Sequence, residues 1–287
     1  MKNIINYDKV LENSRFLLKE KITRTKLKSL VLGISGGVDS AIVAAIAKPI
    51  CDELNIPLIG RYIHIESNKK EEKERAEDIG KAFCTDFQSI DLTEYFDTLK
   101  NLDEMDNEGS PYSEYDYQSK LIRLGNIKAR TRMIYLYNLA SKNGGLVLGT
   151  DNLTEYYLGF WTLHGDVGDF GLIQNLWKSE VHELTLHLAK SLNEKGKVLV
   201  DCAMANATDG LGISETDLEQ IMPDWKERHN TTASGYSEID KKLQSYLKDI
   251  SKGENISKYN NDPVIERHRS SFFKRINPES IDREELI

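Results

Sequence analysis

The hexapeptide at residues 35–40, Ser-Gly-Gly-Val-Asp-Ser, has the clearest chemical meaning of any segment in this chain. It follows an apolar run at residues 30–34 and precedes an alanine-rich stretch at residues 41–47, an order that predicts a buried strand, a glycine turn and a helix. Unpaired backbone N–H groups and the helix dipole at such a turn both favour anions. The glycines let a ligand approach the backbone, and the serines add hydroxyl donors. The segment therefore predicts a phosphate-binding loop.

Asp39 distinguishes this loop from those of enzymes that hydrolyse the γ-phosphate of ATP. The Gly-x-x-x-x-Gly-Lys-Ser/Thr pattern of those enzymes is absent. A carboxylate inside a phosphate site repels the ligand unless a cation lies between them, so we expect Asp39 to hold Mg²⁺. The loop resembles the pyrophosphate loop of the N-type ATP pyrophosphatases, which cleave ATP to AMP and pyrophosphate.

Composition limits the class of protein. The chain has 287 residues, enough for a sizeable core, and a net charge of −8, which argues against non-specific nucleic-acid binding. The longest unbroken apolar stretch, residues 41–47, is too short to cross a membrane, and the N-terminus lacks a signal-peptide pattern. Cys51, Cys84 and Cys202 form no Cys-x-x-Cys pair and are expected to be reduced thiols. These features predict a cytoplasmic protein without nucleic-acid or membrane partners.

Strand and helix patterns alternate through the first two thirds of the chain, which predicts a mostly parallel sheet with helices on both faces. The expected strands span residues 30–34, 57–65, 86–92 and 145–149. The expected helices precede residue 29 and span residues 35–54 (bent or interrupted at Pro49), 68–83 (with Asn68 as N-cap and Glu71 three residues on), 121–143 and 180–192. In such sheets ligands bind at the carboxyl ends of the strands near the topological switch point, where the phosphate loop lies.

The whole chain, residues 1–287, is expected to form a single domain in three parts. Residues 1–29 are a helical segment, residues 30–192 the α/β core, and residues 193–287 an irregular segment with a helix near 236–247 and a polar, basic tail. Residues 101–118 are acidic and aperiodic, which predicts a surface loop or insertion.

Three further stretches narrow the function. Residues 126–133 read Asn-Ile-Lys-Ala-Arg-Thr-Arg-Met on the helix before the fourth strand, and residues 149–155 read Gly-Thr-Asp-Asn-Leu-Thr-Glu directly after that strand. A third, residues 159–166, reads Gly-Phe-Trp-Thr-Leu-His-Gly-Asp. Together with the phosphate loop, in this order, they resemble the ammonia-dependent NAD synthetases. The resemblance runs from about residue 30 to residue 269.

The resemblance implies an open parallel sheet of about five strands, of the Rossmann-like adenine nucleotide α-hydrolase type. It implies a homodimer that converts deamido-NAD⁺, ATP and ammonia to NAD⁺, AMP and pyrophosphate through an adenylated intermediate. Asp39, Glu155 and Lys178 would be catalytic, and Asp39 and Glu155 would share Mg²⁺. The residues implied to bind ATP are Gly33, Ile34, Ser35, Gly36, Gly37, Val38, Asp39, Ser40, Thr150, Lys178 and Thr208. Those implied to bind deamido-NAD are Arg130, Leu163, Asp169, His268 and Arg269.

The chain departs from the family pattern at four places. Leu163-His164 stands where the family has Lys-Tyr, which removes a cation from the dinucleotide contact. Residues 165–178 are one residue shorter than the family segment, and Ala207 replaces the proline that precedes the threonine. Arg269 replaces lysine in the family's His-Lys pair.

Other functions remain open on the sequence alone. One is a different amidating or thiolating pyrophosphatase, acting in GMP synthesis or tRNA modification, although acidic charge and missing cysteine pairs count against tRNA thiolation. A non-catalytic nucleotide sensor is another, and a degenerate paralogue acting as a partner subunit is a third. The lengths flanking the core are too short for a glutaminase domain, so ammonia is the expected nitrogen donor.

Two local patterns have ordinary explanations. His182 and His187 superficially suggest a zinc protease, but they are five residues apart and do not share a helix face, so packing or surface roles are expected. The aromatic set Tyr156, Tyr157, Phe160 and Trp161 could be core or could line a nucleotide pocket.

Overall fold

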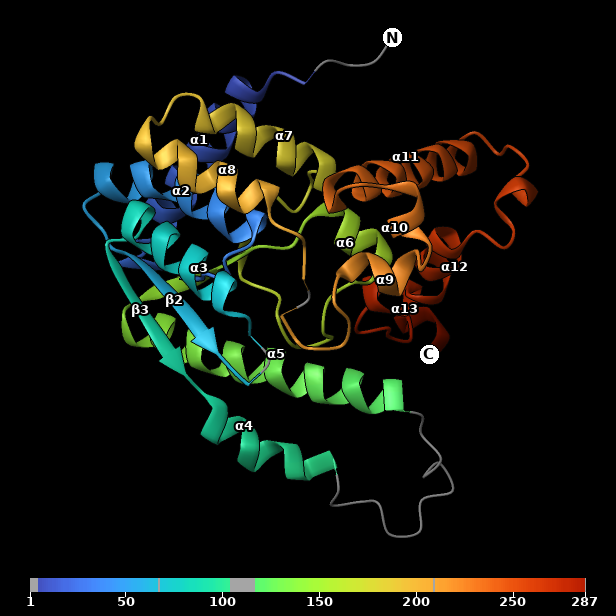
Figure 1. The fold of residues 1–287 in the computed structure, drawn as a ribbon, viewed down its shortest axis with the longest axis horizontal. Coiled ribbons are helices and arrows are strands. Elements are labelled where there is room, and N and C mark those ends of the chain that lie inside the picture. The colour runs from blue at the N-terminus through green and yellow to red at the C-terminus, as the bar shows by residue number, and fades with distance from the viewer. Residues whose placement is uncertain (1–4, 67, 104–116, 209, 287) are drawn as a thin grey trace.

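The structure, a computed structural model, describes residues 5–66, 68–103, 117–208 and 210–286. Within them, five parallel strands form one sheet in the order β3-β2-β1-β4-β5 (Figure 1). The strands are β1 (Ser29–Gly33), β2 (Leu58–His64), β3 (Asp86–Asp91), β4 (Gly145–Gly149) and β5 (Phe170–Gly171). The order reverses between β1 and β4, which confirms the predicted open parallel sheet and puts the loop after β1 at the switch point.

Helices cover both faces of this sheet. One face packs against α1 (Tyr7–Thr25), α2 (Val38–Glu53), α3 (Lys70–Phe83), α7 (Lys178–Ala189) and α8 (Glu194–Met204). The other packs against α4 (Thr93–Leu99) and α5 (Tyr117–Lys142), with the short helix η1 (Lys100–Asp103) after α4. Alternation along β1 explains the two cores, because Leu30 and Leu32 face the first layer and Val31 faces the second.

The C-terminal third forms a separate helical group with its own apolar cluster, to one side of the sheet (Figure 1). Its members are α9 (Asp217–Ile221), α10 (Trp225–Arg228), α11 (Thr232–Ser251), η2 (Ser257–Tyr259), α12 (Pro263–Ser270), α13 (Phe272–Arg275) and α14 (Arg283–Leu286). The short α6 (Leu153–Leu158) joins this group to β4 through Leu158, which lies in the same cluster.

Some local predictions are wrong. α2 continues through Pro49 without interruption, because the helix is buried against the sheet and packing outweighs one lost hydrogen bond. The N-cap of α3 is Lys69, not Asn68, because the Asn68 side chain accepts from the Ile65 N–H instead, at 3.1 Å. The Glu72 carboxylate, not that of Glu71, accepts the Lys69 N–H at 3.2 Å.

Residues 193–287 are also more ordered than predicted. α8, α9 and α10 occupy much of the segment expected to be irregular, and α12 buries Val264 and Ile265 completely where a polar tail was expected. Most of the acidic stretch at 101–118 lies outside the described residues. No helix among the described residues has both the length and the apolar character needed to cross a bilayer.

Candidate active site

The phosphate loop is preorganised by its own hydroxyl groups. The Gly37 N–H donates to Ser35 Oγ at 3.3 Å, and Ser40 Oγ donates to the Gly37 carbonyl at 3.1 Å. Gly36 has φ 85°, and a Cβ there would lie 2.3 Å from the backbone oxygen of Glu72 on α3. Only glycine therefore allows this turn to pack against α3 while α2 begins at its end. The result is a helix N-terminus with exposed donors.

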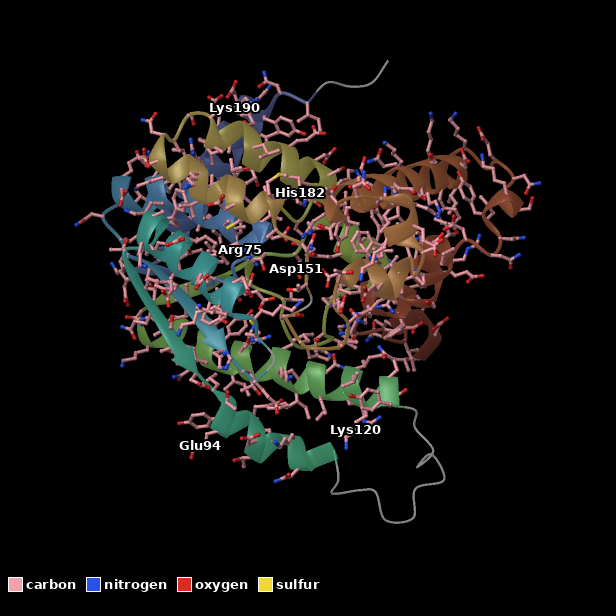
Figure 2. All side chains as sticks on the ribbon, in the orientation of Figure 1. Arg75, Glu94, Lys120, Asp151, His182 and Lys190 are labelled. Carbon is pink, nitrogen blue, oxygen red and sulfur yellow. The ribbon has the colours of Figure 1, made fainter. Side chains whose placement is uncertain are left out.

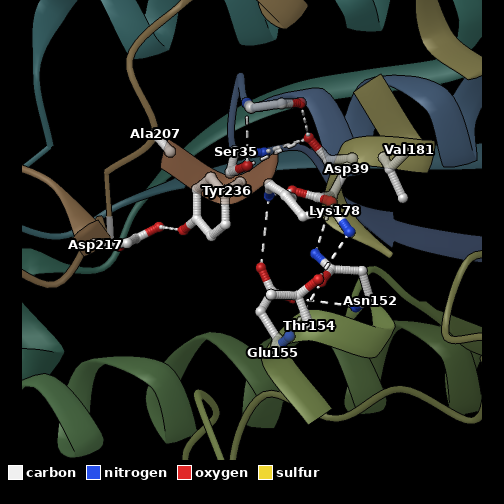
Figure 3. A network of polar contacts seen from close by, with 12 residues as sticks. Ser35, Asp39, Asn152, Thr154, Glu155, Lys178, Val181, Ala207, Asp217 and Tyr236 are labelled. Atoms are coloured by element: carbon white, nitrogen blue, oxygen red, sulfur yellow. Dashed lines mark hydrogen bonds and ion pairs between the residues drawn. The ribbon is translucent and has the colours of Figure 1, made fainter. Parts of the chain in front are cut away.

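Asp39, Lys178 and Glu155 meet beside this loop (Figure 3). The Lys178 ammonium forms an ion pair with Asp39 Oδ2 and lies 3.5 Å from Glu155 Oε1. The Asn152 amide donates to Asp39 Oδ1 at 3.1 Å. Asp39 belongs to the first turn of α2, Glu155 to α6 and Lys178 to the start of α7. The structure thus brings together the three residues predicted to be catalytic, although they lie far apart in the chain.

Glu155 is held by the cap of α6. Asn152 Oδ1 accepts the Glu155 N–H at 3.1 Å, and Glu155 Oε2 accepts the Asn152 N–H at 3.1 Å, which is a capping box. This reciprocal pair fixes one carboxylate oxygen of Glu155 and leaves the other toward Lys178. The Gly-Thr-Asp-Asn-x-x-Glu pattern therefore has a direct structural cause.

Negative charge exceeds positive charge at this site. Burial raises the pKa of Glu155 well above its usual value, and the nearby carboxylates of Asp39 and Asp151 add to that effect against the opposing Lys178. Burial, Asp166 and Asp39 raise the pKa of Asp151 to about 7. Burial alone would lower the pKa of Lys178, but Asp39 and Glu155 outweigh it and raise that pKa. One ammonium among three carboxylates leaves room for a further cation.

The donor set fits Mg²⁺ only with help from a ligand. Within the part of the chain that the structure describes, no cluster of three or more His, Cys, Asp or Glu side chains could hold a metal ion. Asp39 and Glu155 supply two carboxylates, and Mg²⁺ commonly binds one or two carboxylates together with substrate phosphates and water. The excess negative charge and the adjacent phosphate loop make the pair suitable for a phosphate-bound Mg²⁺.

A cavity of about 670 Å³ lies over these residues, between the sheet and the C-terminal helices. Figure 2 labels Arg75, Asp151 and His182, which all line it. All but one of the predicted ATP-binding residues also line it: Gly33, Ile34, Ser35, Gly37, Val38, Asp39, Ser40, Thr150, Lys178 and Thr208. Gly36 is covered by α3 instead, where Arg75 Nε donates to the Gly36 carbonyl at 2.9 Å.

Thr208 lies in the segment between α8 and α9 that borders the cavity. Its hydroxyl donates to Glu72 Oε1 at 2.6 Å. Nearby, Arg132 donates to the Gly210 carbonyl at 3.0 Å and Lys128 to the Leu211 carbonyl at 3.1 Å. These contacts hold the segment against α3 and α5, with Thr208 at the cavity wall.

The residues predicted to bind deamido-NAD lie outside this cavity. Arg130 is exposed and donates to the Leu163 carbonyl at 2.9 Å, so these two are neighbours. Asp169 lies at the sheet edge, where its carboxylate accepts the Val147 N–H at 2.9 Å. His268 lies 2.8 Å from the Tyr157 carbonyl, and Arg269 donates to the Tyr246 hydroxyl at 3.0 Å. His268 and Arg269 therefore contact neighbouring helices and do not line the cavity.

Lys274 is one of the basic cavity residues that sequence reasoning missed, with Arg61, Arg75 and Arg267. It lines the cavity from α13, donates to the carbonyls of Gly159 and Trp161, and lies 5.5 Å from the centre of the Trp161 ring. Burial, with a smaller effect of Arg267, lowers its pKa to about 8. In the sequence, Lys274 is marked by a second basic pair, Lys274-Arg275, shortly after the predicted substrate-binding pair His268-Arg269.

The aromatic set divides in two. Phe160 and Trp161 line the cavity, and Tyr156 stacks on Trp161 at 5.8 Å between ring centres. Tyr157 stacks on Trp177 and packs beside His268 in the helical core. Phe160 and Trp161 are therefore cavity residues, whereas Tyr157 is part of the helical packing.

Comparison with known proteins finds similarity to the NAD synthases. A sequence profile of the family described as NAD synthase matches residues 10–278. The NH(3)-dependent NAD(+) synthetase of Finegoldia magna is 30% identical over 246 residues, covering 84% of this chain and 92% of the relative. That of Mycoplasma genitalium is 35% identical over 231 residues, covering 77% and 84%.

Solved structures agree on the fold. The NMN synthetase of Francisella tularensis superimposes with a TM-score of 0.71 at 22% identity, over 97% of this chain and all of the other. The NH3-dependent NAD synthetase of Campylobacter jejuni, solved with nitrate, gives 0.66 at 24% identity over the same shares. At these identities the likeness establishes the fold alone.

Proposed function

Because the chain belongs to the NAD synthase family, we propose that it is an ATP-dependent ligase that amidates deamido-NAD⁺ to NAD⁺ with ammonia. The observation that carries the proposal is the meeting of Asp39, Lys178 and Glu155 beside the phosphate loop, inside a cavity of about 670 Å³. A site that only sensed a nucleotide would not need two carboxylates and a lysine at the phosphates.

In the proposed reaction, as the family implies, there are two steps. A carboxylate oxygen of the nicotinate attacks the α-phosphorus of ATP, the bond to the β-phosphate oxygen breaks, and pyrophosphate leaves. Ammonia then attacks the carbonyl carbon of the acyl-adenylate, the bond to AMP breaks, and the nitrogen loses a proton. Adenylation is needed because a carboxylate has no leaving group of its own. The protein positions the reactants and stabilises charge without a side-chain nucleophile.

The roles of the residues follow from their places. The N–H groups and hydroxyls of the phosphate loop bind the polyphosphate, and Lys178 stabilises the charge of the departing pyrophosphate. Asp39 and Glu155 would hold Mg²⁺, which neutralises phosphate charge when it is bound. Thr150 and Thr208 supply hydroxyl contacts to ATP from two walls of the cavity.

For deamido-NAD⁺ we assign two groups of residues. Lys274, with Trp161, faces the cavity and suits an anionic or aromatic part of the substrate. Arg130, Leu163 and Asp169 are the residues implied by the family pattern, and they lie on the surface near one another or at the adjacent sheet edge. Because they lie outside the cavity, we propose that a second molecule completes that part of the site. His268 and Arg269 are implied by the family pattern alone, and because they do not line the cavity we leave them out of the proposed site.

A homodimer would supply that second molecule. α5 exposes Ile134 and Tyr137 on the same face as Arg130, and Val167 beside them accepts a hydrogen bond from the Tyr137 hydroxyl at 2.9 Å. Ile134 is 67% exposed and lies beside the exposed side chains of Tyr137 and Val167, and a contiguous exposed apolar patch is typical of a protein interface. Ile134→Asp should shift the protein to monomer in light scattering and raise the KM for deamido-NAD⁺. A monomeric wild-type protein with full activity would exclude this arrangement.

One assay tests the function directly. AMP and pyrophosphate release from ATP should require deamido-NAD⁺, Mg²⁺ and NH₄⁺, with Lys178→Ala as a control whose rate is strongly reduced but measurable. Xanthosine monophosphate and nicotinate mononucleotide are the competing acceptors, and glutamine is the competing nitrogen donor. Equal rates with xanthosine monophosphate, or none with deamido-NAD⁺, would refute the substrate assignment. A preference for nicotinate mononucleotide would keep the amidation chemistry and move the substrate to the mononucleotide.

A further inference from the structure

Asp240 on α11 forms a buried polar relay with the start of α7. Its side chain is almost fully buried, and its Oδ2 accepts the Ser179 N–H at 2.8 Å. Its Oδ1 accepts the hydroxyl of Thr154 on α6 at 2.5 Å, and Thr154 Oγ accepts the Lys178 N–H at 2.8 Å. The relay therefore ties three helices together at the first residue of α7.

The relay satisfies backbone groups that α7 cannot satisfy itself. The first N–H groups of a helix have no intrahelical partner. Those of Lys178 and Ser179 are taken by Thr154 and Asp240, so the beginning of α7 is fixed against α6 and α11. Lys178 is the residue fixed most directly, and Thr154 immediately precedes Glu155. One buried hydroxyl thus joins the backbone of Lys178 to the helix that carries Glu155.

α11 also supports the other end of the Lys178 side chain. Tyr236 lies one helical turn before Asp240 on the same face, and its ring centre is 5.4 Å from the Lys178 ammonium (Figure 3). Its hydroxyl donates to Asp217 Oδ2 at 3.2 Å, which holds the ring in place. α11 therefore supports Lys178 at both ends, through the Asp240–Thr154 contact at its backbone and through the Tyr236 ring beside its ammonium.

We propose that Asp240 and Thr154 are positioning residues that act through Lys178, placing its ammonium for the departing pyrophosphate. The role of Lys178 in that step rests on the function proposed above. Neither residue touches a reactant. Small displacements of a charge-stabilising group reduce turnover strongly, because the stabilisation depends on preorganised geometry.

The competing explanation is a helix cap that contributes only to stability. Thr154→Val removes the hydroxyl at nearly constant volume, and Thr154→Ser retains it. Thr185→Val is the matched control, because Thr185 is equally buried on α7 and donates only to the Val181 carbonyl, at 2.7 Å. Asp240→Asn tests the other end of the relay.

Turnover should separate the two explanations. We expect Thr154→Val and Asp240→Asn to lower kcat by about tenfold to a hundredfold, with the KM for deamido-NAD⁺ changed by less than about threefold. Thr154→Ser should restore most of kcat, and Thr185→Val should leave it near wild type while lowering Tm to a similar extent. Equal kcat for Thr154→Val and Thr185→Val at matched folded fraction would overturn the proposal.

A mutant cycle with Lys178→Ala tests whether the effect passes through the lysine. In that background Thr154→Val should cost no further turnover, whereas independent effects would multiply. The same cycle measured as ATP binding by calorimetry needs no acceptor substrate. There, Thr154→Val should weaken binding only when Lys178 is present, and equal weakening in both backgrounds would overturn the proposal. Failure of the wild type to form AMP would refute the proposed function. The ATP-binding measurements of this cycle could still be interpreted in that case.

Discussion

The two walls of the cavity are built in different ways. The phosphate-loop wall comes from one contiguous stretch that runs from β1 into α2, and the hydrogen bonds of its serine hydroxyls join residues at most five positions apart. The opposite wall is assembled from α6, α7 and the C-terminal helices, with contacts such as those of Lys274 to Gly159 and Trp161 across more than a hundred residues. A local wall can be recognised from a short motif, whereas an assembled wall has no such motif.

The largest expected effect tests the centre where the walls meet. Asp39→Asn and Glu155→Gln should each lower kcat at least about a hundredfold, comparable with the loss of one strong electrostatic stabiliser. Both changes are nearly isosteric, so Tm should change little. Steady-state kinetics at saturating Mg²⁺ and circular dichroism on heating provide the measurements. Near-wild-type rates for both variants would exclude a shared metal at this pair.

A smaller effect tests the assembled wall. Lys274→Met keeps the aliphatic stem over Trp161 and removes the charge, so the KM for deamido-NAD⁺ should rise about tenfold with kcat nearly unchanged. Arg269→Met is the matched control and should leave KM unchanged. The reverse result would restore the His268-Arg269 assignment.

The same lysine predicts a pH dependence. Because its pKa is lowered to about 8, the cation is lost as pH rises through that value. In the wild type the KM for deamido-NAD⁺ should therefore rise above pH 8, and this rise should be absent in Lys274→Met. Ammonium acts in the opposite sense on kcat, since the free amine fraction grows with pH, so KM and kcat must be measured separately.

The smallest effect concerns His182, a buried residue of α7 whose pKa is lowered from 6.5 to about 4 by burial and by Lys178. When the pKa of a histidine is lower in the folded protein than in the unfolded chain, the protein loses stability as pH falls below the pKa of the unfolded chain. The reason is that the unfolded chain binds the proton first. Between pH 7.5 and pH 5.5 the free energy of unfolding of the wild type should decrease. In His182→Phe this decrease should be smaller by about 1 kcal/mol. Urea unfolding at both values measures it, with surface residue His187→Phe as control. An unchanged pH dependence would mean that His182 titrates normally.

Prediction from the sequence succeeded where structure is local. The strand–loop–helix unit at residues 30–54 and the four longer strands follow from short-range patterns of apolar, glycine and polar residues. α8 and α12 were missed because their apolar residues pack mainly against other segments, so their own sequences carry weak signals. The start of α3 was misplaced because Asn68 is engaged by Ile65 and Arg132.

The residues of this chain by themselves determined the phosphate loop, the sheet class and the chemical types of the catalytic groups, because strand, turn and helix formation depend on neighbours in sequence. The tertiary structure alone decided that Lys178 lies between Asp39 and Glu155, that Lys274 and not Arg269 faces the cavity, and that Asp240 secures α7. These juxtapositions come from packing whole helices against one another. Such packing is set by the combined burial of many apolar side chains, and no single segment encodes it.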